Sequence, residues 1–86
     1  MLALTIYSRP GCHLCDEMKT LVQRVIRAHD LPIAIGEVDI STDPELETLY
    51  SLEIPVLVLN GRKIAKYRIG EEELRRALAG QLGEAG

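Results

Sequence analysis

The chain has few aromatic residues and no concentration of positive charge. Its 86 residues include three tyrosines but no phenylalanine or tryptophan, so aliphatic side chains must fill the core. A hydrophobic content of 47% is enough for one small domain, which we expect to span residues 1–86. The formal net charge is −3 and the basic residues are dispersed. A nucleic-acid partner is therefore not expected, because such proteins carry a basic stripe with interleaved aromatics.

Long apolar runs are also missing. No run approaches the ~18 residues that would indicate a membrane span, so no membrane partner is expected. The sequence enters a strand-like pattern almost at once, without a charged leader and a small-residue cleavage site. Two cysteines are too few for a disulfide-rich secreted scaffold. Together these features predict a protein of the reducing cytoplasm.

The two cysteines are three positions apart, at Cys12 and Cys15. A strand-like run over residues 2–7 precedes them and a helix-like run follows. In the first turn of a helix, this spacing lets the two sulfurs meet and close a disulfide. The unpaired N–H groups and partial positive charge of the helix N-terminus favour a thiolate there. A C-x-x-C beside a β-α-β pattern therefore predicts a redox-active dithiol.

Two other interpretations of the cysteine pair are buried apolar cysteines and half of a metal site. Tetrahedral zinc needs four ligands, and only His13 and His29 remain as histidine partners. His13 lies between the cysteines, and His29 should lie about four helical turns away. We therefore expect no metal, and dithiol chemistry needs no bound organic cofactor.

Local signals predict the order β-α-β-α-β-β-α, which is an α/β fold. Asp43 and Pro44 are typical of a helix start, as N-cap and first helical residue. Asn60-Gly61 predicts a hairpin turn, in which both residues take positive φ. A right-handed crossover should pair the first two strands in parallel, and the hairpin should add two antiparallel strands. This four-stranded mixed sheet needs helices on both faces. The expected strands cover residues 2–7, 33–40, 56–59 and 62–68, and the helices begin near residues 12, 44 and 70.

One stretch of the sequence resembles a known family. It reads Tyr7-Ser8-Arg9-Pro10-Gly11-Cys12-His13-Leu14-Cys15. Together with Ile54-Pro55 and the closing hairpin and helix, it resembles the glutaredoxin branch of the thioredoxin-fold superfamily. The likeness is greatest to small bacterial glutaredoxin-like proteins with a Cys-His-Leu-Cys site, and it covers essentially the whole chain. It implies a glutaredoxin-like thioredoxin fold.

The resemblance also implies roles for individual residues. Cys12 matches the attacking cysteine and Cys15 the resolving one. Pro55 matches a cis proline that faces them across the site. The Ile54 backbone would offer strand-like hydrogen bonds to a bound peptide or to glutathione, and Arg9 matches a basic position of many glutaredoxins.

Two segments depart from the family pattern. His13-Leu14 replaces the usual Pro-Tyr between the cysteines, which removes the tyrosine. The glycine and aspartate segment that helps to hold a carboxylate of glutathione is reduced to Gly70 and Glu71 with their neighbours. A backbone N–H at Gly70 or Glu71 would still be able to bind that carboxylate.

The charges around Cys12 should favour its thiolate. Helix N–H groups and Arg9 should lower the pKa of Cys12, whereas Asp16 and Glu17 oppose this from exposed, screened positions. We expect the lowering effects to win, and a protonated His13 would add to them. The alternative interpretations are a solvated surface cation for Arg9 and a solvent-facing spacer for His13.

The sequence thus predicts a small thiol–disulfide oxidoreductase that reduces protein disulfides or glutathione mixed disulfides through Cys12 and Cys15. Glutathione, a co-substrate, with glutathione reductase would reset it. One alternative is an electron donor that is coupled to thioredoxin reductase and does not use glutathione. Another is an iron–sulfur or metal-carrying module, for which Leu14 in place of tyrosine would leave room. A third is a non-catalytic interaction domain.

Overall fold

The computed structural model describes residues 2–83, so Met1 and residues 84–86 of the predicted single domain lie outside the described residues. The elements follow the predicted order, with one additional short 3₁₀ helix, η1. They are β1 (Leu2–Ser8), α1 (His13–Ala28), β2 (Ile33–Asp39), η1 (Ile40–Thr42), α2 (Pro44–Tyr50), β3 (Val56–Leu59), β4 (Arg62–Lys66) and α3 (Glu71–Gly83). Within this range, no helix has the length and apolar character needed to cross a membrane.

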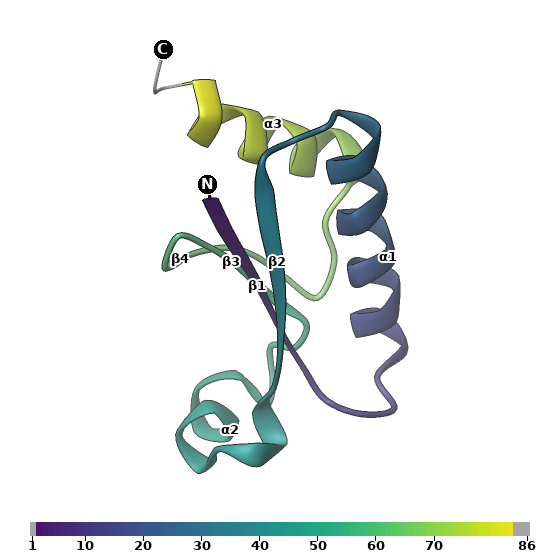
Figure 1. Cartoon of the computed structure of the whole chain (residues 1–86). Helices are drawn as coiled ribbons and strands as arrows, with labels where there is room; N and C mark the ends of the chain where they lie inside the picture. Colours follow the sequence, from purple (N-terminus) through teal and green to yellow (C-terminus); the bar gives the residue numbers. More distant parts are fainter. Residues whose placement is uncertain (1, 84–86) are drawn as a thin grey trace.

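The four strands form one mixed sheet in the order β2-β1-β3-β4 (Figure 1). β1 pairs with β2 in parallel, and β3 is antiparallel to both β1 and β4. Both pairing directions agree with the prediction. Tyr7 in β1 lies opposite Val56 in β3. The chain that leaves β1 and the chain that enters β3 therefore lie at the same end of the sheet.

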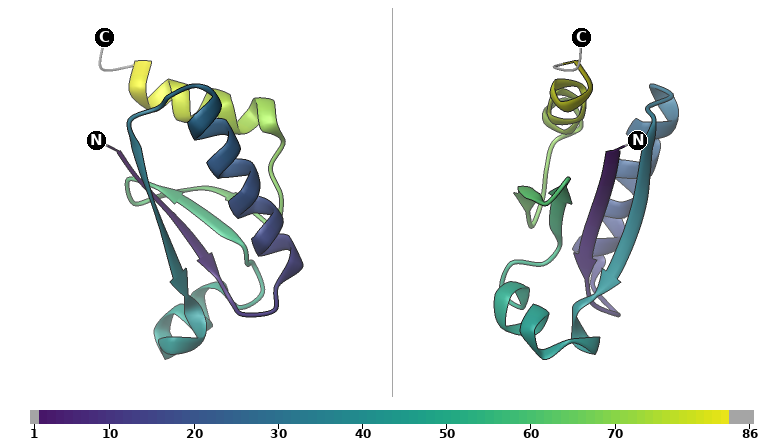
Figure 2. Two further views of the ribbon diagram at one scale, coloured as in Figure 1. Left: turned by 45° about the vertical axis from the view of Figure 1, so that its right-hand side comes forward. Right: turned by 60° about the vertical axis from the view of Figure 1, so that its left-hand side comes forward.

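Helices cover both faces of the sheet, as predicted. On one face, α1 and α3 pack over β1 and β3, and Figure 2 shows α1 running along the sheet. The buried residues of this core are aliphatic or methionine, as the shortage of aromatic residues required: Leu4, Ile6, Met18, Val22, Val25, Ile33, Leu57, Leu59, Leu74 and Leu78. On the other face, Tyr7 stacks against Tyr50 at the end of α2, with ring centroids 4.7 Å apart. The start of α1 and the helix α2 thus lie at the end of the sheet that carries the cysteines, whereas α3 lies toward the opposite end (Figure 1).

Two local predictions are confirmed at atomic detail. The Asp43 carboxylate accepts the Glu45 N–H at 2.9 Å, and Pro44 is the first residue of α2. In the hairpin turn, Asn60 has φ 51° and Gly61 has φ 82°. The Asn60 side chain also accepts the Ala3 N–H at 3.1 Å, which ties the turn to β1.

Four predicted boundaries are wrong by one or two residues. The strand expected over residues 2–7 extends to Ser8. The strand expected over residues 62–68 ends at Lys66, because Tyr67 takes a left-handed backbone with φ 65°. The strand expected over residues 33–40 ends at Asp39, whose carboxylate accepts the Ser41 N–H and begins η1. The helix expected from Cys12 begins at His13, because Cys12 has extended backbone angles and acts as the N-cap.

Candidate redox site

Cys12 occupies the N-cap position of α1. Its Sγ accepts a hydrogen bond from the Cys15 N–H at 3.1 Å. Such a bond satisfies one of the free N–H groups of the first helical turn. Gly11, just before it, has φ 77°, a left-handed conformation that a residue with a side chain would adopt only with strain. The chain therefore turns sharply between β1 and α1, and the turn delivers the Cys12 sulfur to the helix N-terminus.

Cys12 and Cys15 form a disulfide with their Cα atoms 5.2 Å apart, well inside the usual range for such a bond. The two cysteines differ in exposure. Cys15 is only 2% exposed, whereas Cys12 is half-buried. A disulfide-containing substrate can therefore approach Cys12, while Cys15 is covered by the protein.

The Ile54–Pro55 peptide bond is cis, as the family resemblance implied. Pro55 is buried, and its carbonyl accepts the Tyr67 N–H at 2.9 Å. The Ile54 N–H donates to the Tyr50 carbonyl at 3.1 Å, so it is already occupied. Among residues 2–83, the Ile54 carbonyl accepts no hydrogen bond, and it is the group left to pair with an extended peptide.

Arg9 is paired with a carboxylate. Its guanidinium donates two hydrogen bonds to Glu47 of α2, at 2.7 and 2.8 Å. Both side chains are a little over one-third exposed. Arg9 is therefore not the solvated cation of the alternative interpretation, and Glu47 balances much of the charge expected to act on Cys12. Glu47 lies 38 residues further along the chain, and no local pattern links the two.

Besides the Arg9–Glu47 pair, a second set of hydrogen-bonded polar side chains lies near the turn that precedes Cys12, and Glu37 is at its centre. The Lys19 ammonium donates to Glu37 at 2.9 Å, and the buried Ser8 hydroxyl donates to the same carboxylate at 3.1 Å. The hydrogen bond from Lys19 lowers the pKa of Glu37; burial opposes this shift and the Ser8 hydroxyl supports it. This network joins the end of β1 to α1 and β2.

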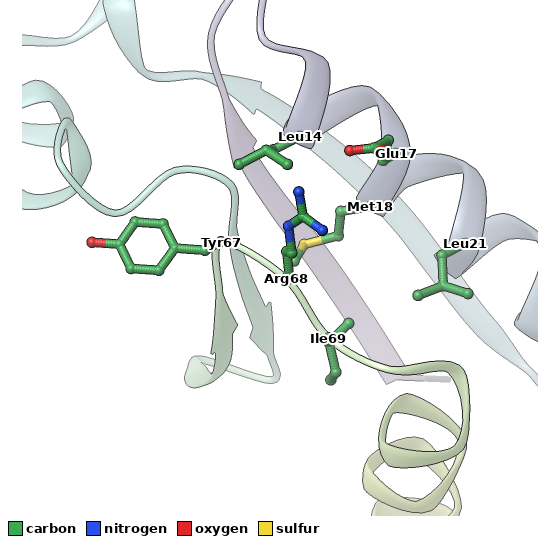
Figure 3. Close-up of a pocket in the computed structure, with 7 residues that line it drawn as sticks. All are labelled: Leu14, Glu17, Met18, Leu21, Tyr67, Arg68 and Ile69. Carbon is green, nitrogen blue, oxygen red and sulfur yellow. The ribbon is translucent and has the colours of Figure 1, made fainter.

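The residues between the cysteines face different surroundings. His13 is exposed, in keeping with the spacer interpretation. Leu14 is half-buried and lines a cavity of about 160 Å³ between α1 and the segment after β4 (Figure 3). The lining residues are Leu14, Glu17, Met18, Leu21, Tyr67, Arg68 and Ile69.

Gly70 and Glu71, predicted to bind a substrate carboxylate, do not line this cavity. Both are exposed, and the Glu71 carboxylate accepts a hydrogen bond from Arg24 of α1 at 2.7 Å. Tyr67 and Arg68 do line the cavity, and sequence reasoning did not select them. These two residues line the cavity because β4 ends at Lys66, and no pattern in the sequence predicts that the strand ends at this residue.

Within residues 2–83, no group of three or more His, Cys, Asp and Glu side chains is arranged to hold a metal ion. His29, the other histidine considered as a ligand, is the C-cap of α1, at the far end of the helix from Cys12.

The sheet order, the C-x-x-C disulfide at the start of α1 and the cis proline at the same end define a thioredoxin fold with a dithiol site. The sequence model of the family described as Glutaredoxin-like domain (DUF836) matches residues 3–79. The chain therefore belongs to the glutaredoxin-like domain family. Family and cysteine pair together indicate thiol–disulfide redox chemistry.

Solved structures share the fold of this chain. The X-ray structure of protein XcR50 from X. campestris is 32% identical, with a TM-score of 0.76, over 90% of this chain and 96% of that one. The solution structure of protein Ne2328 from Nitrosomonas europaea is 24% identical, also with a TM-score of 0.76, over 90% and 91% of the two chains. Chloroplastic thioredoxin z is similar in fold, at 15% identity and a TM-score of 0.74, over 100% of this chain and 80% of that one.

Proposed function

We propose that the chain is a thiol–disulfide oxidoreductase that reduces protein disulfides or glutathione mixed disulfides. The observation that carries this proposal is the unequal placement of the two sulfurs. Cys12 is accessible, and its Sγ accepts the Cys15 N–H, whereas Cys15 is 2% exposed. This is the arrangement expected for one attacking and one resolving cysteine.

The reaction has two exchange steps. The Cys12 thiolate attacks one sulfur of the substrate disulfide, forms a mixed disulfide and releases the other substrate sulfur as a thiolate. Cys15 then gives up its proton to a departing thiolate, attacks the Cys12 Sγ and releases the second substrate thiol. Two electrons pass from the dithiol to the substrate, and the chain is left with the Cys12–Cys15 bond.

The protein residues suffice for both steps. The Cys15 N–H stabilises negative charge on the Cys12 sulfur, and the free Ile54 carbonyl can accept a hydrogen bond from an extended substrate. No metal or bound organic cofactor takes part in the proposed reaction. A reducing compartment such as the cytoplasm would suit this direction of electron flow.

Two reductants are candidates for resetting the disulfide. Glutathione with glutathione reductase is the first. Thioredoxin reductase is the second, and the incomplete glutathione segment favours it, because Glu71 and its acidic neighbours Glu72 and Glu73 add carboxylates where glutathione binding was expected. The iron–sulfur alternative predicts visible absorbance in an anaerobically purified sample, and a colourless, iron-free sample would argue against it.

The test is reduction of a glutathionylated peptide and of a disulfide peptide under NADPH, with either reductase system. Cys12→Ser should abolish turnover of both substrates. The matched variant, Cys15→Ser, should retain the attack and accumulate a mixed disulfide on Cys12, visible as added mass. Full activity of Cys12→Ser would overturn the proposal, and turnover with one reductase system alone would identify the reductant.

A further inference from the structure

The cavity beside Leu14 contains a cation without a partner. Figure 3 shows the Arg68 side chain extending toward α1, close to Leu14 and Met18. Six other basic side chains form ion pairs, namely Arg9, Lys19, Arg24, Lys63, Arg75 and Arg76. Arg68, which is exposed, forms none with any residue from 2 to 83. The same holds for Arg27, Arg62 and Lys66, but of these four only Arg68 lines the cavity. A guanidinium beside apolar side chains such as Leu14, Met18 and Ile69 is suited to bind a carboxylate.

The position of Arg68 is set by the redox site itself. Tyr67, the preceding residue, donates its N–H to the Pro55 carbonyl at 2.9 Å and its hydroxyl to the Leu52 carbonyl at 2.7 Å. The Arg68 N–H donates to the Lys66 carbonyl at 2.8 Å. These three bonds hold the left-handed kink at Tyr67 and fix the segment against the loop that contains the cis proline. The backbone of Arg68 is thereby held next to the loop that contains Pro55.

We propose that this cavity binds a carboxylate side chain of a protein substrate, next to the disulfide that Cys12 attacks, with Arg68 as the specificity-determining residue. Leu14 directly precedes Cys15, so the cavity begins at the active-site turn. An extended chain advances about 3.3 Å per residue. An Asp or Glu within a few residues of the substrate cysteine therefore reaches it. This inference rests on the proposed function and names the class of protein substrate.

A protein side chain suits the cavity better than glutathione does. The volume of about 160 Å³ is small, and Glu17 contributes a carboxylate to the lining. Glutathione has two carboxylates, and Glu17 would repel whichever of them Arg68 does not bind. A single acidic side chain meets less repulsion, because it brings only one carboxylate, which can face Arg68 while its carbon chain contacts the apolar lining of Leu14 and Leu21.

The test compares two disulfide peptides that are identical except for a Glu or a Gln beside the cysteine. The unsubstituted chain should reduce the Glu peptide with a kcat/KM about two- to fivefold higher, the range of a surface ion pair, and salt should weaken this preference. Arg68→Gln should remove the preference through KM, without changing the alkylation rate of Cys12. Arg27→Gln, the same change at an exposed position in the last turn of α1, should keep it.

The outcomes separate this inference from the proposed function. If the chain reduces both peptides equally well, or if Arg68→Gln keeps the preference for Glu, the carboxylate site is wrong and the oxidoreductase stands. A third substrate, the Gln peptide with glutathione attached to its cysteine, tests the remaining possibility. If Arg68→Gln loses activity on this substrate alone, Arg68 binds glutathione instead and the inference is overturned. If the chain reduces neither peptide, the proposed function fails, and the substrate class fails with it.

Discussion

Reducing the Cys12–Cys15 bond should lower the free energy of unfolding by an amount that depends on pH. The bond joins residues separated by 3 in sequence, so it closes a small ring. The chain-entropy relation for a ring of this size gives about 2 kcal/mol of stability to the oxidised form. For a domain of this length, that corresponds to about 8–16 °C in Tm.

The reduced form has a compensating term. If its Cys12 sulfur keeps the hydrogen bond from the Cys15 N–H at the helix N-terminus, we expect this bond to favour the thiolate in the folded chain and so to lower the pKa of Cys12. A lowered folded-state pKa contributes stability that is fully present above the unfolded value, about 8.5, and is lost as pH falls through the folded value. The free energy of unfolding of the oxidised form should therefore exceed that of the reduced form by the full ~2 kcal/mol at about pH 5. Near pH 8.5 the difference should be smaller.

The assay is urea unfolding of the oxidised and the reduced chain at a series of pH values. All other titratable groups are common to both forms, so the difference between the two free energies isolates the cysteines. A difference that stays constant between about pH 5 and pH 8.5 would show that the fold does not stabilise the Cys12 thiolate. A difference that widens with pH would refute the reasoning outright.

Three further predictions concern the scaffold. Leu74→Ala should cost about 3–4 kcal/mol in urea unfolding, because Leu74 is fully buried, whereas Leu49→Ala, at a 62% exposed position, should change stability by less than about 0.5 kcal/mol. The lowered pKa of Glu37 stabilises the fold above the ordinary carboxyl range, and this contribution is lost as pH falls through the folded value; Glu37→Gln should flatten that part of the acid-unfolding curve. Asn60→Ala should cost about 1–3 kcal/mol in thermal unfolding, because alanine disfavours φ 51° and cannot accept the Ala3 N–H; a smaller loss for Asn60→Gly would separate the two causes.

The features that the sequence predicted well depend on neighbours in the chain. The N-cap at Asp43 and the turn at Asn60-Gly61 follow from contacts or backbone angles within a few residues. The position of Cys12 at a helix start is of the same kind, although it caps α1 instead of belonging to it. Such features are predictable because the residues that determine them are adjacent.

The parts that sequence reasoning missed depend on contacts across the fold. Glu47 pairs with Arg9 only because α2 packs beside the end of β1, and nothing local identifies that partner. Arg68 lines the cavity because Tyr67 turns left-handed to bond with Pro55 and Leu52. A tyrosine in that conformation is rare enough that no propensity predicts it.

The location of Cys12 at the N-cap of α1 and of Cys15 in its first turn has a consequence for how the oxidation state is recognised. Residues three apart on a helix are already neighbours, so the 5.2 Å between their Cα atoms is close to what the helix provides without the bond. Making or breaking the bond thus requires no movement of the sheet or of the other two helices. We therefore expect the structural change that accompanies reduction to stay close to Cys12 and Cys15. A partner that must distinguish the reduced dithiol form from the oxidised disulfide form therefore has to contact the turn at Cys12 itself.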